Sequence, residues 1–484
     1  MLNRQYDIKL SPYRSLYDKI VPENNVFRRM ADEIDFCFVM DELESKYSNQ
    51  TGRNAVSPIQ MIKYLIIKVY TDLSDRDVVE QVRVNMAYKY FLDLNPEDEP
   101  VDHSSLSVFR RTRLKDTNIL DLLIKKTVEI ALEKKIIKKK TDIIVDSTHT
   151  LSPFHPYRPL DYLKMRSKKL RQAIYSIDEN YVGKIGNDHE IKELAEELEY
   201  TKKLLSTVKE QHPELLDDKR FILEYNKFEE AIGDVEDHYT ASVIDKDARV
   251  GHKTSDTDFF GFKSHIAITK ERIIVGAVIT SGEKSDTEQA QALINKVEDN
   301  DLQIDTLIGD GAYSSKEILE SAKDKFSVAA PLNPIVFNGN RKPEDRLEFN
   351  KDAGRPICKA GHIAVKERLV TYKSKNQAKV YTFDKSKCEC CKLRSQCNPQ
   401  LKNKTYSIPV HTSEQERQMV YQQTDRYKEK MKHRYKIEAK NAELKQLGYG
   451  RADSYGLEAM TIQAAMTMFF VNIRRIFKLK DMPK

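Results

Sequence analysis

The chain has 484 residues, of which 40% are hydrophobic and 32% are charged, and this balance excludes an intrinsically disordered chain. No stretch approaches the roughly 18 consecutive apolar residues that a membrane-spanning helix needs, and residues 1–20 lack the apolar segment of a secretion signal. The net charge of +6 arises from many charges of both signs, so it is compatible with nucleic-acid binding but does not establish it. We therefore expect a cytoplasmic globular protein of roughly two to four structural units with no membrane partner.

The N-terminal part of the chain is predicted to be helical after a short arm. Residues 1–45 carry short mixed segments, and residues 46–136 show helical periodicity. Ser57 precedes a proline, and Ser74 precedes Asp77 by three positions, so both serines are typical of helix starts. Two helices joined by a tight turn fit a helix-turn-helix DNA-binding domain, and they also fit an ordinary helical hairpin.

A basic helix is predicted near residue 102, where Asp102 or Ser104 can cap its start. Its cations include Arg110, Arg111 and Arg113. A helix face of this kind either contacts DNA phosphates or is simply solvated.

Residues 140–335 alternate strand and helix signals around a long helical stretch. A coiled-coil-like helical hairpin is predicted as an insertion over residues 155–236, because apolar residues recur there by three and four positions. The predicted strands cover residues 141–148, 259–270, 271–280 and 303–310, and a predicted helix covers residues 286–299. Two adjacent strands, a helix and a further strand indicate an α/β sheet with antiparallel and parallel parts.

Residues 336–410 are predicted to form a cysteine-bearing insertion, and residues 411–484 are predicted to be C-terminal helices. The spacing of four cysteines in this insertion suits a structural zinc ion and leaves Cys390 over. These four are Cys358, Cys388, Cys391 and Cys397. The alternatives are thiols that pack within a small subdomain or that are redox-labile.

Two aspartates stand at the ends of predicted strands. Asp146 follows an apolar run, and Asp310 ends the strand that begins at residue 303. The C-terminal ends of neighbouring strands are where α/β sheets place ligand sites. Two carboxylates there would repel each other unless a cation lay between them, and magnesium prefers such oxygen ligands. Taken singly, each aspartate also fits a turn or cap residue.

A third candidate carboxylate lies on a predicted helix near the C-terminus. Arg434, Glu438 and Lys445 are spaced so that they share one helical face. Spacing alone does not select Glu438 over Glu443, and an Arg–Glu pair four residues apart is commonly a surface salt bridge.

The order of these motifs resembles the DDE transposases of bacterial insertion sequences. IIVDSTHT, with Asp146, is similar to the first catalytic block of that family, and IGDGAYSS, with Asp310, is similar to the second. The pattern Arg-x3-Glu-x6-Lys around Glu438 resembles the third block, with Met431 where the family usually has tyrosine. The segments from PYRSLYDKIVPENN to DHSSLSVFRRTR resemble the N-terminal domain of the insertion sequence 1182 subgroup, so the resemblance covers nearly the whole chain.

The resemblance implies an α/β fold with an RNase H-like catalytic core. The helical and cysteine-bearing insertions would interrupt this core, and an all-helical N-terminal domain would precede it. Asp146, Asp310 and Glu438 would hold two divalent ions, magnesium or manganese. Arg434 and Lys445 would contact DNA phosphates, unless they pair with glutamates on the helix surface.

The implied activity is DNA transposition. The protein would bind the terminal inverted repeats of its element, cleave them by metal-assisted hydrolysis and join the 3′-hydroxyl ends to target DNA. Its partners would be these DNA molecules and a second copy of the chain in a homodimer associated with the bacterial nucleoid. Two alternatives are a catalytically silent DNA-binding protein derived from a transposase and an RNase H-like nuclease without strand transfer. His149 is interpreted as a support residue, and Asp247 and Asp286 are secondary candidates for metal ligation.

Overall fold

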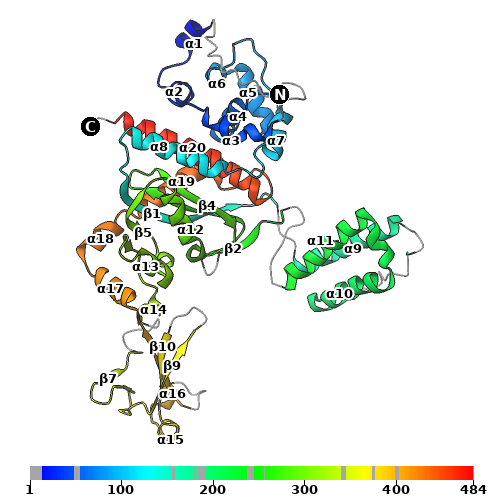
Figure 1. Cartoon of the computed structure of the whole chain (residues 1–484). Helices are drawn as coiled ribbons and strands as arrows, with labels where there is room; N and C mark the ends of the chain where they lie inside the picture. Colours follow the sequence, from blue (N-terminus) through cyan, green and yellow to red (C-terminus); the bar gives the residue numbers. More distant parts are fainter. Residues whose placement is uncertain are drawn as a thin grey trace. The chain divides into compact units, whose positions relative to one another are not determined.

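The structure is a computed structural model of the whole chain (Figure 1). Residues 13–47, 55–154, 158–177, 181, 191–236, 245–254, 257–338, 345–372, 377–397 and 403–482 are described. Residues 1–12 of the predicted arm and residues 155–157 of the predicted insertion therefore lie outside the described residues. In the described ranges, no helix has the length and apolar character needed to cross a membrane.

The chain divides into two compact units. The first contains Met1–Lys138, Ser147–Asn300 and Glu438–Lys484. The second contains Lys139–Asp146 and Asp301–Ile437.

Short helices precede the predicted helical domain. Helices α1 (Arg14–Ile20), α2 (Val26–Glu33) and α3 (Phe38–Leu43) bury apolar side chains. Helices α1 and α2 pack on α6 (Met86–Phe91), and α3 packs on α4 (Pro58–Thr71). The helical N-terminal region therefore starts near residue 14, and the described part of the predicted arm is folded.

The two predicted helix starts are confirmed in position. Pro58 begins α4, although the Ser57 side chain makes no capping hydrogen bond. Ser74 caps α5 (Asp75–Val84), because its hydroxyl accepts a 3.2 Å hydrogen bond from the N–H of Asp77. Helix α5 packs on α7 (His103–Thr112), which Asp102 caps as predicted.

The main sheet combines antiparallel and parallel strands, as the sequence predicts. Its strand order is β2-β3-β1-β5-β6, with β4 paired to β3. Strand β3 is antiparallel to β2 and β4, whereas β5 is parallel to β1 and β6. The strands are β1 (Lys140–Leu151), β2 (Arg249–Thr254), β3 (Thr257–Thr269), β4 (Ile274–Ser281), β5 (Gln303–Ile308) and β6 (Ser327–Ala329). Strand β1 contributes its residues up to Asp146 to the second unit and the rest to the first.

Apolar helices cover β4 in the first unit. Helices α8 (Ile119–Glu133) and α20 (Leu457–Lys480) run side by side and pack against β4 (Figure 1). The buried Asn472 amide of α20 donates to the Thr127 hydroxyl and to the backbone of Ile274. Helix α12 (Asp286–Glu298) also packs on β4, on the side where Gly276 leaves room for the helix.

The predicted insertion is a small helical body with its own core. Helices α9 (Pro159–Ile177), α10 (Leu194–Gln211) and α11 (Lys219–Glu236) pack on one another. Leu170, Val208 and Phe228 are fully buried in their shared core. The coiled-coil spacing indicates a two-helix hairpin, whereas the structure has three helices because α9 supplies a further apolar face.

The second unit carries the remaining short elements. After β5 come the single-turn helix η4 (Gly311–Ser314), α13 (Lys316–Ala322) and α14 (Pro334–Asn338). The cysteine-bearing segment contains β7 (Glu348–Asn350), β8 (Arg355–Ile357), β9 (Lys366–Thr371), β10 (Gln377–Thr382), β11 (Thr405–Val410), α15 (Lys385–Glu389) and α16 (Arg394–Cys397). Helices α17 (Ser413–Tyr421), α18 (Asp425–Met431) and α19 (Tyr435–Leu444) follow along the chain. The mixed α/β class predicted from the sequence is confirmed.

Candidate functional site

The two predicted aspartates lie near the end of the parallel pairing between β1 and β5. Ile144 pairs with Ile308 in the register of these strands. Asp146 lies two residues further along within β1, and Asp310 lies two residues past Ile308, the last residue of β5. Adjacent strands are about 4.8 Å apart, which makes carboxylates at such positions close neighbours. Both aspartates are half-buried.

Asp310 is oriented by the turn that follows β5. Its Oδ1 atom accepts a 2.9 Å hydrogen bond from the N–H of Ala312 and so caps η4. Its Oδ2 atom makes no hydrogen bond within the described residues. Asp310 therefore caps η4 with one carboxylate oxygen and leaves the other oxygen for another partner. The cap and the metal-ligand interpretations from the sequence are thus compatible.

A buried polar network lies on the opposite face of β1. Ser147 follows Asp146, and its hydroxyl donates a 3.0 Å hydrogen bond to Asp286. The carboxylate of Asp286 also lies 3.1 Å from His265 and 3.6 Å from Lys263. Burial alone would raise the pKa of Asp286, but His265, Lys263 and Ser147 together lower it. Successive strand residues point to opposite faces of a sheet, so this network contacts β1 on the face opposite to the Asp146 side chain.

The other secondary candidate and the neighbouring histidine have structural contacts. The carboxylate of Asp247 accepts a 2.8 Å hydrogen bond from the N–H of Leu457 at the start of α20. The ring centroids of His149 and Phe259 lie 4.9 Å apart. Both contacts are consistent with residues that support the fold.

Ion pairs in the first unit distinguish Glu438 from Glu443. Glu443 lies 3.1 Å from Arg272 and 2.9 Å from the fully buried amine of Lys440. Glu438 is exposed and has no ion pair within the described residues. Burial lowers the pKa of Lys440 to about 8, although Glu443 counteracts this shift. Glu443 thus neutralises a buried cation, whereas the carboxylate of Glu438 faces solvent.

The chain after α19 is joined to the end of β1. The N–H of Leu151 donates to the carbonyl of Gly450, and the N–H of Ala452 donates to the carbonyl of Leu151. The Thr150 hydroxyl donates to the carbonyl of Tyr449, whose buried phenol lies 2.7 Å from the Ser264 hydroxyl. These contacts tie the segment that follows α19 to the last residues of β1, which belong to the same unit.

The basic residues that flank Glu438 in sequence differ in exposure. Arg434 is half-buried, and its Nε atom has no hydrogen-bond partner in the described part of the chain. Lys445 is exposed at the beginning of a π-helical turn, Lys445–Tyr449. In the second unit, the Lys430 amine of α18 lies 2.6 Å from Asp142 and 3.2 Å from Asp305. This buried cluster fixes α18 against β1 and β5.

The three arginines predicted to bind DNA have different surroundings. Arg110 forms a two-pronged ion pair with Asp75, with one contact of 3.0 Å. Arg113 donates to the carbonyl of Lys46 and stacks 4.4 Å from the Tyr47 ring centroid. Arg111 is exposed and has no ion pair with any described residue. Two of the three side chains therefore hold the helical region together.

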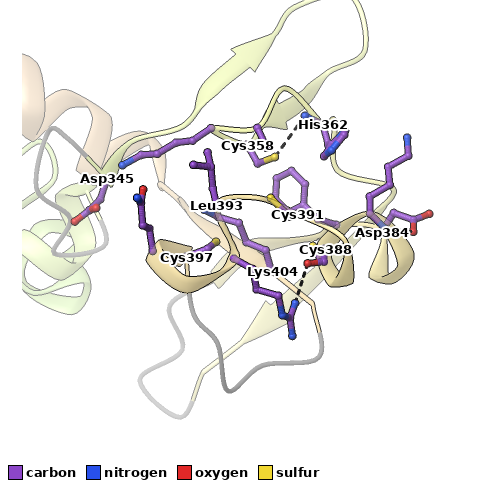
Figure 2. A pocket seen from close by; sticks show the side chains of 15 residues that line it. Asp345, Cys358, His362, Asp384, Cys388, Cys391, Leu393, Cys397 and Lys404 are labelled. Atoms are coloured by element: carbon purple, nitrogen blue, oxygen red, sulfur yellow. Dashed lines mark hydrogen bonds between the residues drawn. The ribbon is translucent and has the colours of Figure 1, made fainter.

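The four cysteines of the predicted zinc set line one cavity of about 160 Å³ in the second unit (Figure 2). His362 lines it too, and its backbone N–H donates a 3.4 Å hydrogen bond to the sulfur of Cys358. Cys390 does not line the cavity and is exposed. The sequence signal for His362 is its position four residues after Cys358, within a turn that Gly361 makes with a φ of +81°.

No three His, Cys, Asp or Glu side chains are arranged to hold a metal ion within the residues that the structure describes. The chemistry of the donors still separates the two candidate sites. Asp146 and Asp310 present oxygen atoms, which suit magnesium or manganese, whereas the cysteine cavity presents sulfur atoms, which suit zinc.

Two known families match the chain. A family described as "Transposase domain (DUF772)" matches residues 15–112, and one described as "Transposase DDE domain" matches residues 216–473. The second match spans more than half of the chain and contains Asp310 and Glu438, but it begins after Asp146. No curated protein matches the chain. The mixed sheet and its helices are consistent with the RNase H-like core of that family. The chain therefore belongs to the family of DDE transposases.

Proposed function

We propose that this transposase cleaves the inverted-repeat ends of its own element and joins the resulting 3′-hydroxyl groups to target DNA. It would use Asp146, Asp310 and Glu438 and act as a homodimer that brings two DNA ends together. The observation that supports the proposal is the parallel pairing of β1 with β5, in which the last paired residues, Ile144 and Ile308, each precede one of the two aspartates by two positions. A pair of carboxylates on one face has the donor set that a divalent ion requires.

The chain's own residues would divide the work. Asp146 and Asp310 supply oxygen ligands, and the capping bond from Ala312 fixes the orientation of Asp310. Glu438 is exposed and so can turn its carboxylate toward a ligand. Magnesium or manganese bound there would lower the pKa of the attacking water or hydroxyl and stabilise the leaving oxygen. Arg434 would donate from its guanidinium to a DNA phosphate.

The test is a cleavage and strand-transfer assay in magnesium on a plasmid that carries the DNA flanking the coding sequence. Asp146→Asn, Asp310→Asn and Glu438→Gln are each expected to lose at least about 100-fold in cleavage rate while still binding DNA. The control is Glu429→Gln on α18, whose side chain is exposed and which should keep wild-type activity.

Three outcomes would contradict the proposal. Full activity of Glu438→Gln would assign the role of the third metal ligand to another carboxylate. Cleavage by the wild type without joined products would make the protein a nuclease. DNA binding by the wild type without cleavage would make it a silent DNA-binding protein.

The cysteine cavity supports a second, independent part of the proposal, a structural zinc ion. Cys358, Cys388, Cys391 and Cys397 would bind it through their thiolates. The N–H bond from His362 to the Cys358 sulfur is the kind of contact that orients a metal-binding ligand. This ion would stabilise a segment whose elements are too short to bury a large core.

Metal analysis of the purified protein tests the zinc site. The wild type and Cys390→Ser should contain one zinc per chain, because Cys390 lies outside the cavity. Cys391→Ser should lose the zinc and lower the unfolding temperature. Zinc-free wild-type protein, or equal zinc in both variants, would reject the site.

A further inference from the structure

A basic groove in the first unit runs beside the helix that carries Glu438. Its volume is about 830 Å³. Five cations line it, contributed by α2, the β3–β4 turn and the end of α20. They are Arg29, Arg272, Arg474, Arg475 and Lys478.

The two acidic residues of the groove are already neutralised. Glu443 pairs with Arg272 and with the buried Lys440. Asp481 pairs with Arg29 at 2.6 Å, and Arg29 also stacks on Phe477. Neither Arg474 nor Lys478 forms an ion pair with a described residue, whereas Arg475 interacts electrostatically with Glu443 and Glu271.

The three remaining cations share the last turns of α20. Arg474 and Lys478 are exposed and four residues apart, so they lie on the same helix face. Like charges at this spacing repel each other, and a bound anion would remove that repulsion. Arg475 is held in place because its Nε atom donates a 2.8 Å hydrogen bond to the carbonyl of Glu271. Burial and the neighbouring Arg272 lower the pKa of Arg475, although Glu443 and Glu271 counteract this shift.

Arg272 is presented by an unusual backbone conformation. It has a φ of +67° in the turn between β3 and β4, where its N–H donates to the carbonyl of Thr269. Left-handed conformations are uncommon for residues other than glycine, asparagine and aspartate. The buried Nε atom of Arg272 has no hydrogen-bond partner in the described part of the chain. The presence of an arginine at this backbone position is explained if the groove needs its guanidinium group.

The groove runs along one face of α19. Ala439, Ala442, Glu443 and Gln446 line it, and Glu438 does not. An anion in the groove would therefore lie against the helix that carries Glu438, on a neighbouring face.

We propose that this groove binds the phosphate backbone of duplex DNA, with Arg474, Arg475 and Lys478 as its phosphate-contacting residues. This inference rests on the proposed function, because Glu438 acts on DNA in that account. Guanidinium and ammonium groups are the side chains that bind phosphates, and such contacts do not depend on base sequence. The groove would hold the DNA next to the cleaved phosphodiester, whatever the sequence of the repeat.

The salt dependence of DNA binding tests the groove. The probe is a random-sequence duplex, and its binding to the full chain is measured by fluorescence anisotropy over a range of salt concentrations. Each lost phosphate contact lowers the slope of log affinity against log salt by about 0.9. The double variant Arg474→Gln/Lys478→Gln should therefore lose roughly 2 from the slope and bind more weakly at low salt. The control Lys203→Gln/Lys209→Gln removes the same charge from exposed positions on α10 and should keep the wild-type slope.

The outcomes separate this inference from the proposed function. A wild type that binds and cleaves DNA, with equal slopes in the wild type and the groove variant, would overturn the groove alone. Equal losses in the groove and control variants would also overturn it, because net charge would then explain both. A groove variant that loses dimerisation in sedimentation but keeps the slope would assign the groove to a second copy of the chain. A wild type that does not bind the duplex would overturn the proposed function and the groove together.

Discussion

Lys440 has its amine fully buried beside Glu443, in the neighbourhood of Arg272 and Arg475. A charged amine in this place is stabilised by Glu443 and destabilised by burial and by the two arginines. Glu443 is thus the counter-ion of Lys440 and Arg272. Glu438, five residues earlier, has no such structural partner within the described residues.

The depressed pKa of Lys440 predicts how stability depends on pH. The unfolded lysine has a pKa near 10.5 and the folded one a pKa of about 8, so the unfolded chain binds more protons between these values. The contribution of Lys440 to stability therefore rises as pH increases from about 8 to 10.5. Its full size is on the order of 3 kcal/mol. Lys440→Met should be more stable than the wild type at pH 7, with the difference shrinking toward pH 10 in urea unfolding. Parallel curves for the two proteins would contradict the assignment.

At the scale of elements, the turn after α19 places the segment that pairs with β1. Gly448 has a φ of +78°, and a Cβ atom there would lie 2.6 Å from the Asp72 carboxylate carbon. Asp72 itself ends α4 in a left-handed conformation. Two unusual backbone positions from distant parts of the chain therefore meet at this turn, and only a glycine fits the second one.

Gly448→Ala should destabilise the protein by about 2 kcal/mol or more, because strain at positive φ adds to the contact with Asp72. Gly450→Ala is the matched control, since its φ is −70° and no atom would lie within 4 Å of its new Cβ. That control should leave the urea midpoint unchanged or raise it slightly. Equal effects of the two substitutions would show that the turn geometry is unimportant.

Local sequence patterns predicted the helices and strands that are long enough to show a recognisable pattern. The strands that contain Asp146 or lead to Asp310 were predictable because their apolar runs are encoded within a few residues. The predicted strand end at Asp146 is wrong, because β1 continues to Leu151. Helices α1 and α3, with seven and six residues, are too short for a clear period. Strand β6 has three residues and escapes prediction for the same reason.

At the scale of the whole molecule, distant contacts decide what the sequence left open. The pair of Arg272 and Glu443 joins residues 171 positions apart, and no local pattern reveals it. The contact of Ser147 with Asp286 spans 139 positions, and the groove combines four separate segments. The groove therefore required the fold, whereas the three candidate carboxylates were proposed from the sequence and the family resemblance.

Asp146 on β1 and Asp310 just after β5 are proposed to hold a divalent ion together. The metal dependence of cleavage by Asp310→Cys tests this, because the substitution replaces an oxygen ligand by sulfur. Magnesium binds sulfur poorly, and manganese accepts it more readily. We expect Asp310→Cys to be inactive in magnesium and partly active in manganese, and Asp310→Ala to be inactive in both. Equal activity of Asp310→Cys in the two metals, or activity of Asp310→Ala, would show that Asp310 does not bind the catalytic ion.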